Sequence, residues 1–284
     1  MAASGLSLCT WGMGSLSREE AAAVAAALGF DGVDVGSIGV GGPAKSRFVD
    51  APLEVAAELR SLPLPVANFF YFFGADLRAD RNLADPASHR ANEADLVEVL
   101  RLCVAAAVPS LTLSPGIFNP GQPPAAALEA ASAFLRRAVE LGAESGVTVM
   151  IEPGVQSIAE TPAAVAGLLD RAPGLGLVLD YSHFVCLGHR QENVDALVPR
   201  ADHIHLRQAR PGRLQERLAS FSGTINFPLL FARLRERGYI DQMGRVVPDP
   251  SHGSNPSAVC RLGDRTSETV VIQHPHYLVG PEPP

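Results

Sequence analysis

The sequence predicts an α/β fold, a single (β/α)₈ TIM barrel followed by an irregular C-terminal extension. Short apolar runs alternate with longer alanine-rich, helix-like segments along the 284 residues. Strands that alternate with helices of about ten or more residues form parallel βαβ units, and roughly eight such units fit this length. No Gly-x-Gly-x-x-Gly motif follows the first strand, which argues against an open dinucleotide-binding sheet.

The expected elements follow the apolar pattern of the chain. Short apolar runs predict strands, and longer segments with apolar residues on one helical face predict helices. Helix ends agree: Ser17 precedes two glutamates, Thr161 precedes a proline, and Gly146 follows a long alanine-rich segment. We expect strands at 6–12, 31–36, 64–72, 109–114, 147–152, 176–180, 202–207 and 242–247, and helices at 17–29, 52–62, 88–107, 124–145, 161–171, 192–199 and 227–237.

The composition favours one large domain. The chain is 47% hydrophobic and 19% charged, which supports a large core, and no interdomain linker is evident. Proline-rich patches lie at 119–124 and at the C-terminus, where we expect loop and tail. We therefore expect the barrel to occupy residues 1–247 and the irregular extension, packed on the barrel, to occupy 248–284.

Charge, cysteines and hydropathy narrow the class of protein. The formal net charge is −7 without a lysine- or arginine-rich block, which argues against nucleic acid as the main partner. The four cysteines are dispersed, as is typical of free thiols in a reducing compartment. The N-terminus shows no basic leader, and no run approaches the roughly 20 apolar residues of a membrane helix. We expect a soluble cytoplasmic protein with neither a nucleic-acid nor a membrane partner.

Three consecutive strands end in residue types that bind metals. Glu152, Asp180 and His205 are 28 and 25 positions apart, about one strand-helix-strand unit each. A parallel barrel brings successive strand ends together at one mouth. Burying such groups costs free energy unless they are paired or coordinated. The spacing therefore predicts a divalent-metal site with these three residues as ligands.

Each of these residues also has a structural interpretation. Glu152 could cap a helix or pair with an arginine, Asp180 could form an Asx-turn, and a lone histidine such as His205 most often packs in a core. The metal site is favoured because these explanations would have to coincide on consecutive strands. His203 shares a strand face with His205 but lies one layer deeper, and there we favour a hydrogen-bonded core histidine.

The ligand types suggest which metals and which neighbours to expect. Two carboxylates and an imidazole suit Mn²⁺, Mg²⁺, Co²⁺ or Zn²⁺ and lack the thiolates of a structural zinc site. His183, in the loop after Asp180, can reach a metal-bound substrate or donate to a ligand carboxylate, unless it is a surface histidine. Arg207, Arg210 and Arg213 are either solvated charges or contacts to a substrate hydroxyl, carboxylate or phosphate; Arg207 is the best placed.

Between about residues 145 and 240 the sequence resembles the xylose isomerase-like (β/α)₈ superfamily of sugar (phosphate) isomerases and epimerases. The matching segments have the family's order and spacing, while the first half of the chain matches only in its strand-helix rhythm. The segments are Ile151-Glu152-Pro153, Leu179-Asp180-Tyr181-Ser182-His183-Phe184, His203-Ile204-His205-Leu206-Arg207 running on to Pro211-Gly212-Arg213-Leu214-Gln215, and Gly223-Thr224-Ile225-Asn226-Phe227-Pro228.

The resemblance implies roles for these residues. It makes Glu152, Asp180 and His205 the metal ligands, and it makes His183 and an arginine after the histidine strand, Arg207 or Arg213, substrate contacts. It implies a cation that binds adjacent hydroxyl and carbonyl oxygens of an open-chain sugar while a base removes the neighbouring proton. Members are often dimers or tetramers, so a homo-oligomer is among the implied states.

The sequence departs from the family at the eighth strand, where a glutamate usually supplies the fourth ligand. That position falls at about Val246. Three explanations stay open. Asp249, His252 or Glu268 could fold back as a ligand, the site could use three protein ligands plus water, or the segment could be degenerate or misread and the protein inactive.

The expected function is a metal-dependent isomerase or epimerase acting on a sugar or sugar-like polyol through an enediolate. Two-base epimerisation needs a group on each face of that intermediate. With Glu152 as the clear base, one-base aldose–ketose isomerisation is favoured, or loss of water in a lyase (dehydratase) with His183 as the acid.

Two rivals come from other functional classes. A catalytically impaired sugar-binding protein would keep the pocket after losing the fourth ligand. An abasic-site endonuclease of the same fold is disfavoured by the net charge and by Asn68, Phe69 and Ser114 at earlier strand ends. Aromatic residues at Trp11 and 69–73 either stack on a sugar or pack in the core.

Overall fold

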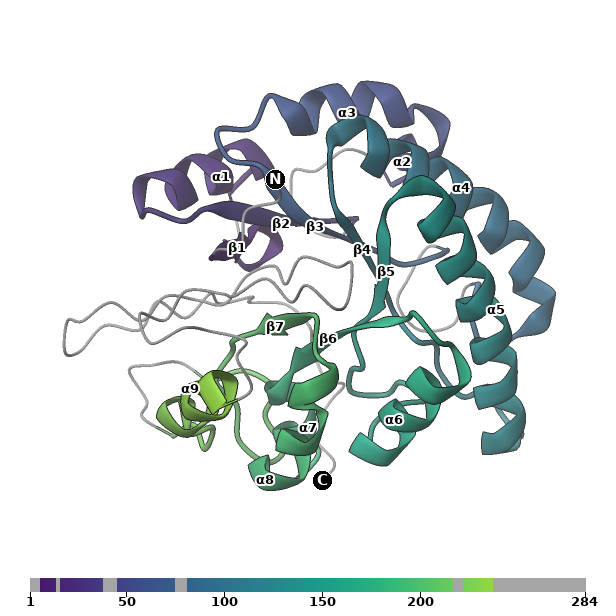
Figure 1. Cartoon of the computed structure of the whole chain (residues 1–284), viewed down its shortest axis with the longest axis vertical. Coiled ribbons are helices and arrows are strands. Elements are labelled where there is room, and N and C mark those ends of the chain that lie inside the picture. The colour runs from purple at the N-terminus through teal and green to yellow at the C-terminus, as the bar shows by residue number, and fades with distance from the viewer. Residues whose placement is uncertain (1–5, 14–15, 38–44, 75–80, 217–221, 237–284) are drawn as a thin grey trace, which may run out of the picture.

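A computed structural model describes residues 6–13, 16–37, 45–74, 81–216 and 222–236 of the chain (Figure 1). Within these ranges seven strands form one sheet in chain order, and every neighbouring pair is parallel. The sheet curves, with helices along its outer side, which is the TIM-barrel arrangement that the sequence predicts. The strands are β1 Ser7–Cys9, β2 Gly32–Gly36, β3 Val66–Tyr71, β4 Ser110–Leu113, β5 Thr148–Ile151, β6 Gly176–Asp180 and β7 His203–His205.

Helices connect the strands and lie outside the sheet (Figure 1). The α-helices are α1 Arg18–Ala27, α2 Arg47–Asp50, α3 Pro52–Arg60, α4 His89–Ala106, α5 Pro124–Ser145, α6 Pro162–Arg171, α7 Tyr181–Cys186, α8 Gln191–Val194 and α9 Phe227–Glu236, and the 3₁₀ segments are η1 Thr10–Met13, η2 Pro86–Ser88 and η3 Asp195–Arg200.

The helix-end chemistry read from the sequence is confirmed. Ser17 and Glu20 form a reciprocal capping box at the start of α1. The Thr161 hydroxyl accepts a hydrogen bond from the Ala164 N–H at the start of α6. Gly146 ends α5 with a φ of +69°, a left-handed conformation that glycine adopts without strain.

Several segments differ from the expected elements. The strand expected at 6–12 ends at Cys9 and is followed by η1, and the short helix α2 was not expected. The helix expected at 192–199 is one turn of α-helix followed by 3₁₀ helix, because Pro199 lacks the N–H that an α-helix needs. Helix α7 was not expected. It starts directly after β6 because the Asp180 side chain accepts a hydrogen bond from the Ser182 N–H and caps it.

The strands separate an apolar layer from a polar interior. Side chains such as Leu111, Ile151 and Leu177 are fully buried in the core cluster that includes the helices. Alternate positions carry polar groups, as expected for a strand with two different faces. In that interior, the Ser110 and Thr112 hydroxyls donate to Asn68 Oδ1 at 3.1 and 2.9 Å. The sheet thus buries polar groups in its concave side, where Asn68 Oδ1 accepts two hydrogen bonds and Asn68 Nδ2 makes none.

Several expectations lie outside the described residues. These are the eighth strand at 242–247 with Val246, the domain boundary at 247, the extension at 248–284, and the replacement ligands Asp249, His252 and Glu268. In the described part of the chain, none of the helices combines the length and apolarity needed to cross a membrane.

Candidate metal centre and active site

The three residues predicted as metal ligands come together at the carboxyl ends of three neighbouring strands. Glu152 follows β5, and its N–H donates to the Leu113 carbonyl at 3.0 Å, which continues the strand pairing. Asp180 and His205 are the last residues of β6 and β7 and are paired in register. One ligand atom from each of the three lies within 4.8 Å of the other two. Sequence spacing therefore located a real cluster.

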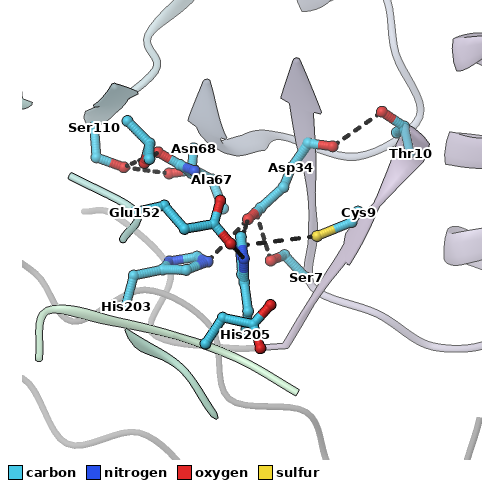
Figure 2. Close-up of polar contacts among 12 residues, drawn as sticks. Ser7, Cys9, Thr10, Asp34, Ala67, Asn68, Ser110, Glu152, His203 and His205 are labelled. Atoms are coloured by element: carbon cyan, nitrogen blue, oxygen red, sulfur yellow. Dashed lines mark hydrogen bonds and ion pairs between the residues drawn. The ribbon is translucent and has the colours of Figure 1, made fainter. Parts of the chain in front are cut away.

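Figure 2 shows the His205 ring in contact with Glu152, Asp34 and Cys9. Its Nδ1 lies 2.9 Å from Glu152 Oε1. Its Nε2 lies 3.4 Å from Asp34 Oδ2 and 3.9 Å from Cys9 Sγ. The edge of the Trp11 ring faces the imidazole, with 6.4 Å between ring centroids. Both ring nitrogens therefore have polar partners, on opposite sides of the ring.

Asp34 on β2 is a site residue that the sequence analysis missed. It is fully buried. Its Oδ1 accepts from the Ser7 hydroxyl at 2.6 Å, and its Oδ2 lies 2.8 Å from His203 Nε2. Burial alone would raise the pKa of Asp34, but the charges and hydrogen bonds of His203 and His205 hold it well below the ordinary value. A carboxylate in the middle of an otherwise apolar strand was the available signal.

His203 has the structural role that the sequence favoured. It is 1% exposed, and its Nε2 contacts the Asp34 carboxylate. Its ring stands nearly perpendicular to that of His205, at 84°. This buried pair ties β7 to β2 across the interior of the barrel.

Asp180 is held by Ser182 and Arg207. The Ser182 N–H donates to Asp180 Oδ1 at 2.8 Å, and Arg207 Nη2 donates to Asp180 Oδ2 at 2.6 Å. Arg207 Nε also donates to the Ser182 hydroxyl at 2.8 Å. Burial raises the pKa of Asp180, but the Arg207 and His183 charges bring it down to about 2. The arginine singled out in the sequence thus lies against the cluster.

His183 faces the cluster from α7. The Val155 N–H donates to His183 Nδ1 at 3.0 Å, and the other ring nitrogen, Nε2, faces the cluster. That nitrogen lies 2.9 Å from Arg207 Nη2, 3.7 Å from Asp180 Oδ2 and 3.9 Å from Glu152 Oε1. Burial, together with the charge of Arg207, outweighs the carboxylates and lowers the pKa of His183. His183 is therefore a neutral imidazole whose Nε2 faces the Arg207 guanidinium and the two carboxylates.

The surroundings of Glu152 keep its carboxylate ionised. Burial would raise its pKa, but the charge and hydrogen bond of His205 lower it below the ordinary value. The same contact acts on His205. Burial lowers its pKa, whereas the Glu152 charge and the contacts with Cys9 and Asp34 raise it well above 6.5. The cluster without a metal is therefore a carboxylate–imidazolium pair.

Arg213 lies in a different environment from Arg207. It is in a tight turn with Arg210, and its guanidinium is 59% exposed. Both arginines contact the buried Glu216, at 2.5 Å for Arg210 and 3.5 Å for Arg213. The contacts of these side chains in the structure are with Glu216, so a substrate contact by Arg213 stays a prediction.

The aromatic run divides between core and mouth. Phe69 packs edge-on against Phe48 in the core. Phe70 packs against Trp11, with 6.0 Å between centroids, and Trp11 in turn faces His205. Core packing is therefore confirmed for Phe69, and stacking of the aromatic residues on a sugar stays a prediction.

Comparison with known proteins establishes the family. The family model described as xylose isomerase-like TIM barrel matches residues 22–257, so the chain belongs to this family. A search of the curated proteins finds no match.

Solved structures share the fold at low sequence identity. An AP endonuclease, family 2, from Brucella melitensis is 19% identical with a TM-score of 0.65, over 83% of this chain and 90% of that one. The IolI protein with a bound zinc atom is 14% identical with a TM-score of 0.63, over 84% and 86%. The 3-keto-D-glucoside 4-epimerase from E. coli is 18% identical with a TM-score of 0.60, over 87% and 94%. At these identities the likeness concerns the fold.

Proposed function

We propose that this protein is a divalent-metal-dependent isomerase or epimerase-type enzyme acting on a sugar or sugar-like polyol through an enediolate. The observation that carries the proposal is the convergence of Glu152, Asp180 and His205 at neighbouring strand ends, with ligand atoms within 4.8 Å of one another. Zinc in the IolI structure and the sugar epimerase of similar fold support it.

The donor set fits a divalent cation. Two carboxylates balance the charge of a dication, and an oxygen–nitrogen set suits Mn²⁺, Mg²⁺, Co²⁺ or Zn²⁺. Glu152, through its carboxylate, Asp180, through Oδ2, and His205, through Nδ1, would hold it. When bound, the cation would polarise the adjacent oxygens of the substrate and so acidify the neighbouring C–H.

The residues around the cluster supply proton transfer and orientation. Glu152 has a lowered pKa and is ionised at neutral pH, so it can accept the substrate proton. His183 is neutral, and its Nε2 lies on the same side as Glu152, where it can exchange a proton with a substrate oxygen. Arg207 holds Asp180 and Ser182 in place and offers a charge for a substrate hydroxyl.

One base suits isomerisation better than epimerisation. The other carboxylates in the described site are occupied: Asp180 by Ser182 and Arg207, and Asp34 by Ser7 and His203. Glu152 contacts His205 through Oε1, and we propose that its other oxygen moves the proton. A single base that removes and returns the proton on one face gives aldose–ketose isomerisation.

Solvent exchange tests this mechanism. Turnover of a substrate sugar in deuterium oxide should place deuterium on the carbon beside the carbonyl, and Glu152→Gln should abolish the exchange. The substrate is found by thermal-shift screening of sugars and their phosphates in the presence of Mn²⁺. Exchange that survives Glu152→Gln would place the base on another residue.

A lyase is the second candidate function. The observation in its favour is the position of His183 Nε2, 3.9 Å from Glu152 Oε1, from which a protonated ring could protonate a leaving hydroxyl. Mass spectrometry separates the two reactions, because β-elimination removes one water and isomerisation conserves mass.

Metal content and net charge distinguish two other candidate functions from the proposed one. A sugar-binding protein without activity should purify with less than about 0.2 equivalents of metal and gain no melting temperature with Mn²⁺. We do not propose the activity of the AP endonuclease of similar fold for this chain, because the formal net charge of −7 disfavours binding to DNA. We propose a small-molecule sugar partner, a cytoplasmic location and a homo-oligomer as one state to test.

A further inference from the structure

His205 also belongs to a second cluster of ligand types. Cys9 Sγ, an Asp34 oxygen and a His205 ring nitrogen all lie within 4.8 Å of one another. Cys9 ends β1 and Asp34 lies on β2, so this cluster is built from the opposite side of the imidazole (Figure 2). Cys9 and Asp34 have no role in the proposed reaction.

The distances in this second cluster resemble those between the ligands of a tetrahedral metal. Bond lengths of about 2.0 to 2.3 Å place the ligand atoms of a tetrahedral zinc roughly 3.3 to 3.8 Å apart. His205 Nε2 lies 3.4 Å from Asp34 Oδ2 and 3.9 Å from Cys9 Sγ. By contrast, the 2.9 Å between His205 Nδ1 and Glu152 is an ordinary hydrogen-bond distance.

Neighbouring groups hold Asp34 in place. The Ser7 hydroxyl donates to Asp34 Oδ1 at 2.6 Å, and His203 Nε2 lies 2.8 Å from Asp34 Oδ2. The Thr10 hydroxyl donates to the Asp34 carbonyl at 3.0 Å. Hydrogen bonds of this kind fix ligand carboxylates in metal sites, and their loss weakens binding.

The two clusters differ in chemical softness. Glu152 and Asp180 offer carboxylates, which suit Mn²⁺ and Mg²⁺, whereas Cys9 offers a thiolate, which selects softer ions such as Zn²⁺. A thiolate and a carboxylate together balance a dication, as two carboxylates do. The His205 ring turns Nδ1 toward one cluster and Nε2 toward the other.

We propose that Cys9, Asp34 and His205 form a second metal site, selective for thiophilic dications such as Zn²⁺ and Cd²⁺, that shares His205 with the proposed Glu152–Asp180–His205 site. One imidazole serves both sites through different nitrogens. Two dications on one ring would repel each other, so a metal at one site should weaken binding at the other. A thiophilic metal bound here would take His205 away from the first site.

The test uses Cd²⁺ alone as the probe, because cadmium–thiolate bonds give an ultraviolet charge-transfer band. Reduced wild-type protein should develop this band up to one equivalent of Cd²⁺. Cys9→Ser and Cys9→Ala should abolish it and weaken Cd²⁺ binding by about tenfold or more. Cys186→Ser is the matched control, because Cys186 is a free, half-exposed cysteine on α7, and it should leave the band unchanged.

A variant of Asp180 distinguishes the two sites. Asp180→Asn should keep the band, because Asp180 belongs only to the first site. No band in the wild type, a band that survives both Cys9 variants, or its loss in Asp180→Asn would overturn the proposal. Circular dichroism of each variant shows that it is folded.

Competition tests the shared imidazole. Calorimetry with Mn²⁺ on the Cys9→Ser protein measures the first site by itself, so failure of either site is seen separately. If Mn²⁺ binds there, adding it to the Cd²⁺-loaded wild type should diminish the band, and adding it to Asp180→Asn should do so less. Simultaneous full occupation of both sites would overturn the sharing of His205.

Discussion

His205 and Glu152 form a buried pair in which Nδ1 lies 2.9 Å from Oε1, while the other ring nitrogen faces Asp34. Contacts on both sides raise the pKa of His205 well above 6.5, against the effect of burial. The ring without a metal is therefore an imidazolium that donates to two carboxylates. A cation that binds through Nδ1 has to displace a proton.

Mn²⁺ binding should consequently tighten as pH rises. The raised pKa of His205 makes proton release part of binding between about pH 6 and 8. Calorimetry at several pH values, in buffers that differ in ionisation enthalpy, measures both the affinity and the number of protons released. Affinity independent of pH, with no proton released, would contradict the displacement of the imidazolium proton.

Asp34→Asn should destabilise the protein strongly. The substitution removes the negative charge that accepts from the buried Ser7 hydroxyl and contacts His203 Nε2, and a hydrogen bond to a charged group contributes about 1.5 to 3 kcal/mol. The exposed Asp170, paired with Arg200 at 2.7 Å, provides the control, and Asp170→Asn should change stability by less than about 1 kcal/mol. Urea unfolding of both variants makes the comparison.

The same aspartate predicts a pH dependence of stability. Because the folded pKa of Asp34 is below its ordinary value of 3.8, its contribution is fully present above that pH and is lost as pH falls through the folded value. Wild-type stability should fall in acid below about pH 4 more steeply than that of Asp34→Asn. An equal loss of stability with falling pH in the two proteins would contradict this role of Asp34.

The sequence predicted which residues lie at the ends of the strands, but it did not predict contacts between strands that are far apart in the sequence. The positions of Glu152, Asp180 and His205 follow from one-dimensional spacing, because each βαβ unit returns the chain to the same mouth. Asp34 has no such signal, since its partners on β7 lie about 170 positions away in the sequence. The Asx-turn offered for Asp180 is present, because its side chain accepts from the Ser182 N–H, whereas the helix α7 that this contact caps was not expected.

Two helix glycines give a test of the packing that positions β5. A Cβ at Gly142 in α5 would lie 2.6 Å from the Val147 carbonyl oxygen and from a Val149 methyl. Gly142→Ala should therefore cost about 1 to 3 kcal/mol. In α6 a Cβ at Gly167 would meet only the flexible end of Arg171, so Gly167→Ala should be neutral or stabilise by up to about 1 kcal/mol. Thermal unfolding compares them, and equal effects would contradict the tight contact of α5 with β5.

Arg207 should oppose metal binding while it supports substrate binding. Its Nη2 lies 2.6 Å from Asp180 Oδ2, the oxygen proposed to hold the cation. Two positive charges about 4 Å apart repel by about 4 kcal/mol at an effective dielectric constant of 20, although rotation of the arginine relieves much of this.

Arg207→Gln should therefore tighten Mn²⁺ binding by about tenfold in calorimetry without substrate, and it should raise KM for the sugar, because a charge that orients the substrate is lost. Arg190→Gln removes an equal charge from a side chain that is 79% exposed, and it should change neither quantity. Weaker Mn²⁺ binding in Arg207→Gln would mean that the guanidinium assists the ligand geometry of Asp180 more than its charge repels the metal.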